Sequence, residues 1–230
     1  MTAGDPSPDG SHGPHVLVDS VEDPQLSDDD RHHLTRVLRV RDGDALTVGD
    51  GAGRWRPCRL GAEPEPTDRV HVVPGPRPAI GVAFALIKGG RPELVVQKLT
   101  ELGVDVIVPF TAGRSVVRWD DTKAVKNHDR LQRVAREAVM QCRRAWLPTI
   151  EPVTTFDAVA ARPGTSMADR LGGPVDLATP LVMIGPEGGW DPHESASELP
   201  RVGLAEPVLR AETAAIAAGV LLASARSGAA

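Results

Sequence analysis

The chain of 230 residues holds 26 Lys and Arg against 31 Asp and Glu, which gives a formal net charge of −5 at neutral pH. Its hydrophobic content of 41% and charged content of 25% are ordinary for a globular protein of one large domain or two modest ones. No run of about 18 apolar residues occurs, so no membrane span is predicted. The two cysteines, Cys58 and Cys142, lie far apart without metal-ligand spacing. We therefore expect a cytoplasmic protein with no disulfide framework and no bound metal.

Charge is distributed unevenly along the chain. Residues 31–60 carry seven Arg against three Asp, a local +4, and residues 111–150 carry nine Lys and Arg against four acids, a local +5. Residues 151–230 carry five Arg against ten acids, a local −5. Phosphate affinity depends on such clusters rather than on the net charge. Solvated faces balanced elsewhere would have the same composition, so charge alone leaves a nucleic-acid partner open.

The first 14 residues, MTAGDPSPDGSHGP, have no basic start and no apolar middle, so they predict a disordered leader rather than a signal peptide. Over residues 15–75, short β-like runs such as HVLV and ALTV alternate with turn clusters. One segment of this region, HHLTRVLR, places Leu34, Val37 and Leu38 at helical spacing among arginines. The region is therefore predicted to be a small, mostly β domain with one basic helix.

From residue 76 to residue 230 the pattern changes to alternating strands and helices. Near-continuous apolar runs predict strands covered on both faces at 79–87, 104–110 and 181–184. Periodicity and end signals predict helices at 91–103, 127–144 and about 212–226, with a short helix opened by Asp191. The Gly- and Pro-rich residues 162–180 predict a loop. Such alternation implies an α/β domain with a parallel sheet and helices on both sides.

Four other candidate motifs have ordinary explanations. DGAG at 50–53 resembles part of a glycine-rich nucleotide loop, but no helix follows it, and a hairpin turn is the better interpretation. Lys88, in KGG, ends a strand, where a phosphate contact and a simple strand-to-helix connection fit equally. Adjacent His32 and His33 have no metal-ligand spacing and are interpreted as surface residues. His193 follows the glycine pair of residues 188–189, but a bystander is a better interpretation than a ligand contact.

The most informative stretch is LVMIGPEGGW, residues 181–190, in which a buried strand runs into Gly-Pro-Glu-Gly-Gly. Glycines allow backbone N–H and C=O groups to reach a ligand directly. About twenty residues later, VLRAET at 208–213 follows a proline and opens an Ala-rich helix with Arg, Glu and Thr. Two such strand-end loops can form two walls of one pocket. Two unrelated loops would not explain both the glycine pair and the polar cluster.

These two segments resemble the SPOUT methyltransferases, and within that superfamily the chain is most similar to the RsmE-type family. HHLTRVLRVRDGD and VGDGAGRWRPCRL look like the family's N-terminal RNA-binding domain, and ALIKGGRPELVVQKLTELGV, RSVVRW and REAVMQCRRAWLPTI are similar to segments of its catalytic domain. The resemblance implies an α/β protein. Residues 15–75 would form a PUA-like small β-barrel, and residues 76–230 a SPOUT domain with a parallel sheet and a C-terminal trefoil knot.

The resemblance also implies an enzyme that methylates N3 of a uridine in 16S ribosomal RNA of the small ribosomal subunit, at the position usually called uridine 1498. Its cofactor would be S-adenosylmethionine. SPOUT relatives dimerise through the knotted region, and the helix after Thr213 is almost wholly apolar, so a homodimer is expected. The implied cofactor site comprises Ile184, Gly185, Pro186, Glu187, Gly188, Leu204, Val208, Leu209, Arg210, Ala211 and Thr213.

Uridine N3 becomes nucleophilic only after losing its proton, and negative charge then develops on the pyrimidine carbonyls. We expect Arg210 to stabilise that charge and to orient the uracil or its phosphate. Glu212 would orient Arg210, accept the proton, or cap the last helix. Phosphate contacts are expected from Arg31, Arg36, Arg39, Lys88, Arg114, Arg118, Arg143 and Arg144. Two alternatives stay open, a SPOUT enzyme acting on another RNA position and a non-catalytic RNA-binding protein.

Overall fold

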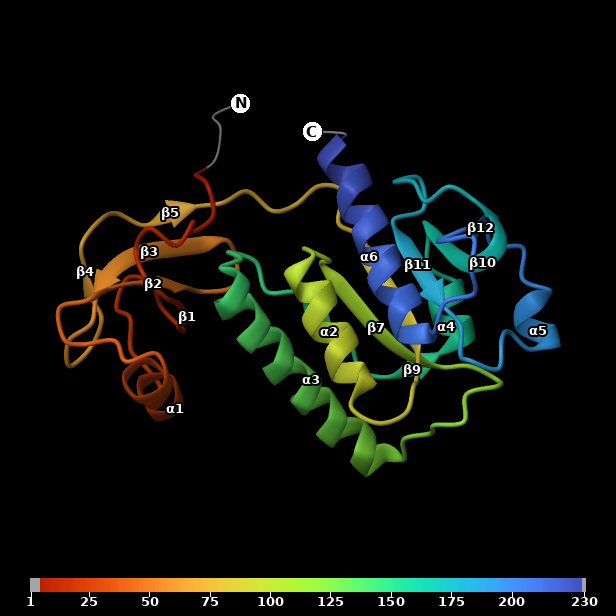
Figure 1. Cartoon of the computed structure of the whole chain (residues 1–230), viewed down its shortest axis with the longest axis horizontal. Helices are drawn as coiled ribbons and strands as arrows, with labels where there is room; N and C mark the ends of the chain where they lie inside the picture. Colours follow the sequence, from red (N-terminus) through yellow and green to blue (C-terminus); the bar gives the residue numbers. More distant parts are fainter. Residues whose placement is uncertain (1–4, 229–230) are drawn as a thin grey trace. The chain divides into compact units, whose positions relative to one another are not determined.

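The computed structural model describes residues 5–228, which form two compact units (Figure 1). The first unit extends to Gly75 and also contains the later segment Arg136–Leu147. The second comprises Pro76–Ala135 and the chain from Pro148 onward. The sequence predicts a domain boundary after residue 75. The membership of residues 136–147 is a finding of the structure, because the apolar stripe of the expected helix continues across residue 136 without interruption.

The described part of the first unit is built on a five-stranded sheet. Its strands are β1 His15–Leu17, β2 Ala45–Gly49, β3 Arg54–Arg59, β4 Glu65–Pro66 and β5 His71–Val72. They are ordered β1-β2-β3-β4, and β5 also pairs with β3. β1 runs parallel to β2, whereas β2 and β3 are antiparallel. The core of this unit includes Leu46, Val48 and Cys58 from the sheet, and Met140 packs against it from the later segment.

The residues before β1 contact this unit, in contrast to the disordered leader expected over residues 1–14. Asp5 forms an ion pair of 2.7 Å with Arg69, and hydrogen bonding from this guanidinium lowers the pKa of the Asp5 carboxyl. The Trp55 indole N–H donates to the carbonyl of Pro6 at 2.9 Å. The expectation for residues 1–4 lies outside the described residues.

The basic helix expected around HHLTRVLR differs from the prediction in its later half. Helix α1, Asp28–His32, begins at Ser27, whose hydroxyl accepts from the backbone N–H of Asp30, and it continues into a π-helical turn, η1, at His33–Val37. Of the expected stripe Leu34 is buried, but Val37 and Leu38 are 59% and 49% exposed. The i→i+5 hydrogen bonds of a π turn change the angular spacing of side chains, so the later apolar residues turn away from the core.

The second unit contains a seven-stranded sheet, and every assigned strand pair within it is parallel. Its strands, all within residues 5–228, are β6 Gly81–Ala85, β7 Val106–Thr111, β8 Thr149–Ile150, β9 Thr154–Thr155, β10 Thr165–Gly173, β11 Leu181–Ile184 and β12 Arg201–Val202. Their order is β12-β10-β11-β6-β7-β8, and β9 also pairs with β7. The expected parallel sheet is confirmed.

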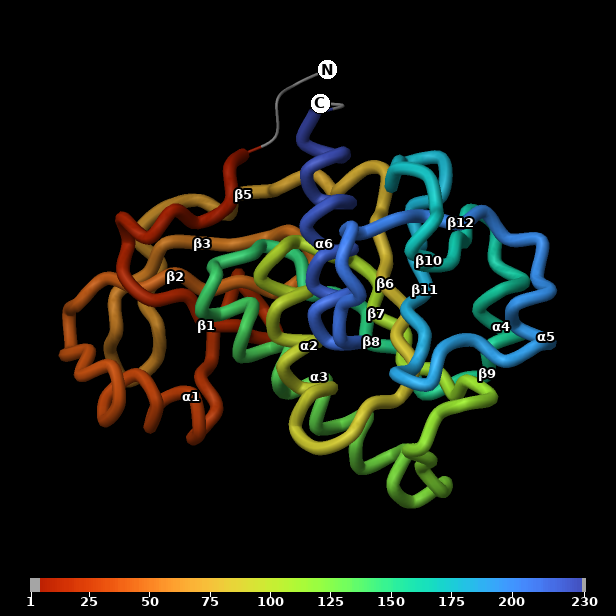
Figure 2. The backbone as a smooth tube through the Cα atoms, turned by 45° about the vertical axis from the view of Figure 1, so that its right-hand side comes forward, coloured from red at the N-terminus to blue at the C-terminus, as the bar shows by residue number. Residues whose placement is uncertain are grey.

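The central strand β6 is buried on both faces. Val82 and Phe84 face a core shared with helices α2, Arg91–Glu101, and α6, Ala211–Gly228. Ala83 and Ala85 face a second core that includes Phe156, the first residue of helix α4, Phe156–Ala160. Helices α2 and α6 lie side by side over one face (Figures 1 and 2). Burial on both faces explains why β6 reads as a near-continuous apolar run.

Two elements of the later chain depart from the prediction. Helix α3 begins at Asp121 rather than near residue 127 and extends to Cys142. Strand β10 occupies much of the expected loop 162–180. It pairs with β11 on one side and β12 on the other, so Thr165 and Ser166 are buried although they are polar. Backbone hydrogen bonds rather than an apolar pattern hold this strand, which is why its sequence predicts a loop.

Burial of His15 on β1 leads to a prediction about stability and pH. The side chain is 3% exposed, and its Nδ1 lies 2.9 Å from the Thr47 hydroxyl. Burial, with a smaller contribution from Arg143, lowers the pKa of His15 to about 4. The unfolded chain binds this proton nearer the usual pKa of about 6.5. The stability present above that pH is therefore lost as the pH falls from about 6.5 to about 4.

Between pH 6.5 and pH 4, the unfolding free energy of His15→Asn should fall less than that of the parent. The difference is on the order of 3 kcal/mol, since each pKa unit corresponds to about 1.4 kcal/mol. Urea unfolding followed at several pH values measures it. His33→Gln, at an exposed histidine of the same unit, is the matched control and should follow the parent. Identical pH dependence in His15→Asn and the parent would contradict the prediction.

Candidate active site

A cavity of about 310 Å³ opens in the second unit at the carboxyl ends of β11 and β12 and beside the middle of β10. Its walls are residues 168–170 of β10, the end of β11, the loops after β11 and β12, and the start of α6. β11 and β10 lie on one side of β6, and β7 lies on the other. Ligands of open parallel sheets bind beyond the carboxyl ends of the strands where the direction of winding changes. The volume is at the lower end of the range for small-molecule sites, roughly 300–1,000 Å³.

The glycines of the loop after β11, residues 185–190, satisfy three different constraints. A Cβ on Gly185 would lie 2.9 Å from the Trp190 ring, and a Cβ on Gly188 would lie 3.3 Å from Cβ of Arg114. Gly189 has a φ of +71°, in the left-handed region that other residues rarely adopt. The sequence predicts close approach of a ligand at these glycines. Within the chain itself they already accommodate Trp190, Arg114 and a turn.

Trp190 holds the end of this loop against the sheet. Its indole N–H donates to the carbonyl of Ala168 in β10 at 3.2 Å. Its ring stacks on Phe110, with centroids 6.3 Å apart and planes 11° from parallel, and Phe156 approaches it edge-on at 5.8 Å. Aromatic packing and the hydrogen bond together fix the point at which the chain leaves the cavity.

The residues after Trp190 form a capped turn. Helix α5, Pro192–Ser195, begins at Asp191, whose carboxylate accepts from the Glu194 N–H at 2.8 Å while the Glu194 carboxylate accepts from the Asp191 N–H at 2.9 Å. The other oxygen of the buried Glu194 carboxylate accepts from the Gly113 N–H at 2.7 Å. Arg114 then donates to the carbonyl of Gly188 at 3.1 Å. These bonds tie the glycine loop and α5 to the loop after β7.

One arginine contacts two walls of the cavity. Arg91, the first residue of α2, places Nη1 3.4 Å from Glu187 Oε1 and Nε 3.6 Å from Glu212 Oε1. Glu187 belongs to the glycine loop, and Glu212 lies in the first turn of α6. The second oxygen of Glu212 is buried and has no hydrogen-bond partner among the described residues. Arg91 therefore links the two loops that the sequence singles out.

Arg210 lies at the start of α6 with an exposed side chain. Its carbonyl accepts from the Ala214 N–H at 2.8 Å. Within residues 5–228 no hydrogen bond or ion pair of its guanidinium is found, so the expected contact with Glu212 is replaced by the contact of Glu212 with Arg91. Its neighbours Leu209 and Ala211 line the cavity. The guanidinium is therefore available to a ligand that carries or develops negative charge.

Most of the residues expected to bind a cofactor line this cavity, namely Ile184, Gly185, Pro186, Glu187, Leu204, Val208, Leu209 and Ala211. Three expected residues, Gly188, Arg210 and Thr213, are not part of its lining. The prediction did not include Ala168, Asp169, Arg170, Gly189, Trp190, Ala205, Pro207 and Ala214, which also line it. The sequence does not indicate the first three, because it predicts a loop where β10 lies, whereas Gly189 and Trp190 stand within the recognised motif.

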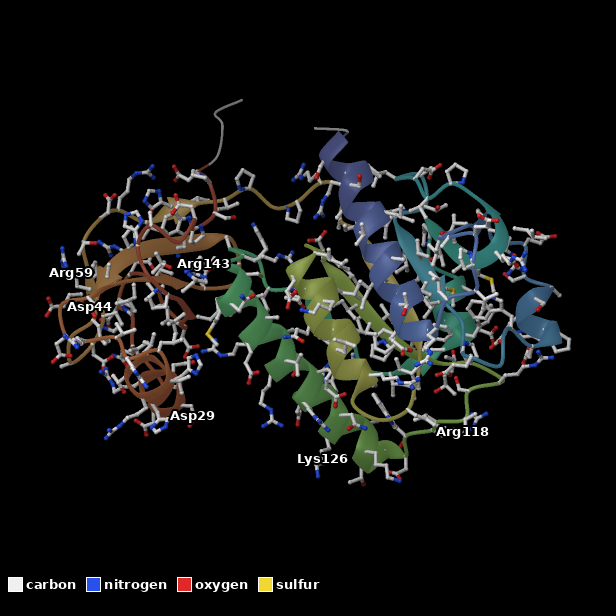
Figure 3. All side chains as sticks on the ribbon, viewed as in Figure 1. Asp29, Asp44, Arg59, Arg118, Lys126 and Arg143 are labelled. Atoms are coloured by element: carbon white, nitrogen blue, oxygen red, sulfur yellow. The ribbon has the colours of Figure 1, made fainter. Side chains whose placement is uncertain are left out.

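Some of the basic residues expected to contact RNA are exposed, namely Arg36, Arg39, Lys88 and Arg118. Their side chains form no ion pair in the part of the chain that the structure describes. Arg118 extends into solvent before α3 (Figure 3). These four remain available for phosphate contacts.

Other expected RNA contacts already have partners within their own unit. Arg31 pairs with Glu63 at 3.5 Å, and Arg143 donates to the carbonyl of Gly13 at 3.5 Å. Arg114 is hydrogen-bonded to the glycine loop, and Arg144 is half-buried. Part of the local positive charge is therefore already engaged in contacts within the protein.

His193 does not line the cavity. Its Nε2 lies 2.9 Å from Asp157 Oδ1 in an exposed pair, and this hydrogen bond raises the pKa of the imidazole. Over residues 5–228, no group of three or more His, Cys, Asp or Glu side chains is placed to hold a metal ion. None of the helices described is long and apolar enough to cross a membrane.

The chain is similar to known RNA methyltransferases in sequence and in fold. The RNA methyltransferase domain family matches residues 74–223, and the RNA methyltransferase PUA domain family matches residues 26–66. Ribosomal RNA small subunit methyltransferase E of Mycobacterium tuberculosis is 32% identical, over 83% of this chain and 82% of its own. The Bacillus subtilis protein of that name is 27% identical, over 82% and 85%. A crystal structure of the Neisseria gonorrhoeae protein of that name, bound to S-adenosyl methionine, is 28% identical, with a TM-score of 0.74 over 91% of this chain and 96% of its own.

Proposed function

Because the chain belongs to the ribosomal RNA small subunit methyltransferase E family, we propose that it transfers a methyl group from S-adenosylmethionine to N3 of a uridine in 16S ribosomal RNA. The proposed target is the position usually called uridine 1498. The small ribosomal subunit is the proposed partner, and the cytoplasm the proposed compartment. The observation that carries the proposal is the cavity beside β10 and at the carboxyl ends of β11 and β12, next to an arginine that has no partner among residues 5–228.

The residues of the cavity fit S-adenosylmethionine. Leu204, Val208 and Leu209 provide an apolar wall for an adenine ring, and the backbone of the glycine loop offers hydrogen-bonding groups at its edge. The carboxylates of Asp169 and Glu187 suit the positive charges of an ammonium and a sulfonium group. When bound, the cofactor supplies an electrophilic methyl group.

Residues of the protein must activate and orient the uracil. Removal of the N3 proton leaves a uracil anion whose charge is shared by the neighbouring carbonyl oxygens. The exposed Arg210 guanidinium is suited to hold that charge and to orient the base. Glu212 takes part indirectly, because Arg91 pairs with both Glu212 and Glu187 and offsets their charges at the start of α6.

The proposal is tested by mass spectrometry of 16S rRNA from a strain that lacks the gene, before and after complementation. Complementation should restore one methyl group at N3 of a single uridine. A methyl group restored at another base or at a ribose would support a SPOUT enzyme of different specificity. Failure of the purified protein to bind S-adenosylmethionine would support a non-catalytic RNA-binding protein.

Gly185→Val should weaken S-adenosylmethionine binding by more than about tenfold, since Gly185 lines the cavity and a branched side chain there meets the Trp190 ring. Calorimetric titration measures the affinity, and circular dichroism checks the fold. Gly173→Ala is the control, because the nearest atom to a Cβ at that position lies 4.0 Å away. Parental affinity in Gly185→Val would exclude this cavity as the cofactor site.

Arg210→Ala should keep most RNA affinity but lower the turnover number by about 10²- to 10³-fold, as expected when one group that stabilises developing charge is removed. The matched variant is the double substitution Arg36→Ala with Arg39→Ala. It should weaken RNA binding, reduce the salt dependence by about one to two counterions, and leave turnover at saturating RNA little changed. If both variants lost RNA affinity equally and kept full turnover, Arg210 would be a phosphate contact and its catalytic assignment would fail.

We also propose a homodimer and a trefoil knot in the C-terminal region. Val220 and Leu221 of α6 are 45% and 36% exposed, and Leu94 of α2 is 40% exposed, so these helices present apolar side chains that a second copy can cover. Light scattering at micromolar concentration should give twice the chain mass of 24.4 kDa. A monomer mass would contradict the dimer.

A further inference from the structure

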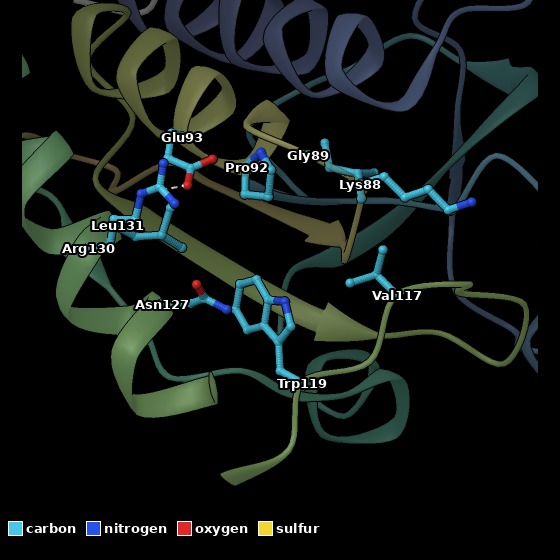
Figure 4. A pocket seen from close by; sticks show the side chains of 10 residues that line it. Lys88, Gly89, Pro92, Glu93, Val117, Trp119, Asn127, Arg130 and Leu131 are labelled. Carbon is cyan, nitrogen blue, oxygen red and sulfur yellow. Dashed lines mark ion pairs between the residues drawn. The ribbon is translucent and has the colours of Figure 1, made fainter. Parts of the chain in front are cut away.

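The second unit contains another cavity, of about 280 Å³, which shares no lining residue with the candidate active-site cavity. It lies beyond the carboxyl end of β6, between the start of α2, the loop that precedes α3, and the first half of α3 (Figure 4). The side chains that decide its chemistry are Pro92, Glu93, Trp119, Asn127 and Arg130. Its volume suits one nucleoside rather than a folded segment of RNA or protein.

The walls of this cavity suit a flat ring. The Trp119 indole forms one side, and Pro92 lies across from it (Figure 4). Pro92 and Leu131 are buried, and Trp119 is half-buried against the main core, so the indole is held in place while one part of it stays accessible. Aromatic side chains held in this way are the usual platforms on which the bases of single-stranded RNA stack.

The polar groups of the cavity distinguish a base from a phosphate. Glu93 Oε1 pairs with Arg130 Nε at 2.9 Å, whereas Glu93 Oε2 is buried and has no hydrogen-bond partner among the described residues. The Asn127 amide lies beside the indole and likewise forms no hydrogen bond within residues 5–228. A carboxylate beside the cavity disfavours a phosphate inside it, and the amide can both donate to and accept from a base. These groups match the hydrogen-bonding edge of a nucleobase.

Three cationic residues line the cavity or directly precede its lining residues in the chain. Lys88 lines it, Arg118 directly precedes Trp119 in the chain, and Lys126 directly precedes Asn127. All three side chains are exposed, and none forms an ion pair in the part of the chain described here. Figure 3 shows Arg118 and Lys126 extending outward at the beginning of α3. An aromatic floor with a basic rim is the arrangement that binds a base and its flanking phosphates together.

We propose that this cavity, the Trp119 pocket, binds an unpaired nucleobase of the RNA substrate other than the uridine that is methylated. The methylated base must approach the methyl group to about 3–3.5 Å. It must therefore bind at the candidate active-site cavity, whose lining is separate from that of the Trp119 pocket. The inference rests on the proposed function, because it assigns this second subsite to the same RNA. A base held here fixes the register of the strand that presents the target.

Three substitutions test the pocket. Trp119→Leu removes the aromatic platform, Trp119→Phe keeps a smaller one, and Asn127→Ala removes the amide. Gln132→Ala, an exposed amide on the same helix outside the pocket, is the matched control. Steady-state kinetics are measured with whichever substrate the parent methylates, free 16S rRNA or the small subunit, together with calorimetry for S-adenosylmethionine.

For Trp119→Leu we expect KM for RNA to rise by roughly 5- to 100-fold, the range for loss of one base–aromatic stack. Trp119→Phe should lie between Trp119→Leu and the parent, and Asn127→Ala should raise KM by several-fold. Affinity for S-adenosylmethionine should stay parental, whereas the unfolding midpoint of Trp119→Leu should fall because the indole packs against the core. A merely structural role of Trp119 would not raise KM for RNA selectively. Gln132→Ala should resemble the parent. Parental KM in both Trp119→Leu and Asn127→Ala would overturn the proposal.

A second measurement tests whether the Trp119 pocket binds RNA and does not depend on methyl transfer. A short single-stranded RNA should quench the tryptophan fluorescence of the parent, and Trp119→Phe should lose most of that quenching while the other tryptophans remain. Unchanged quenching would overturn the pocket whatever the kinetics show. If the parent transferred no methyl group but quenching depended on Trp119, the proposed function would fail and the nucleobase site would stand.

Discussion

The position of the active-site cavity depends on the parallel pairing of β11 with β6 on one side and β10 on the other. Val182 and Ile184 face one core and Met183 the other, so a shift of one residue would move each side chain into the wrong layer. Burial therefore fixes where β11 ends and the glycine loop begins. The same pairing carries the ends of β10 and β12 to this edge, although the chain between them is long.

Two side chains hold the glycine loop in different ways. Trp190 contributes aromatic burial and a hydrogen bond to β10, interactions that water screens little. Arg91 and Glu187 are 41% and 46% exposed, and a pair of this kind contributes about 0–1 kcal/mol. Trp190 therefore sets the position of the loop. Arg91 sets its charge, because it offsets the carboxylates of Glu187 and Glu212 at the proposed active site.

The walls of the cavity differ in how far the sequence reveals them. The glycine loop and the start of α6 are predictable, since a glycine pair and an Arg–Glu–Thr cluster each follow a strand signal. The wall from β10 is not, because Thr165 and Ser166 are held by backbone pairing that has no apolar pattern. Arg91 stands within a recognisable helix start, but its partners lie far along the chain. Pairing between distant side chains depends on topology rather than on local sequence.

The uneven distribution of charge matches the ligands proposed for the two cavities of the second unit. Residues 151–230, with a local charge of −5, supply Asp169 and Glu187 to a cavity whose proposed ligand is cationic. Residues 111–150, with a local charge of +5, supply Arg118, Lys126 and Arg130 around a pocket proposed to receive RNA. A cofactor that carries a sulfonium and a substrate that carries phosphates require opposite surroundings. The two segments cancel in the total, so the net charge of the chain carries no information about either ligand.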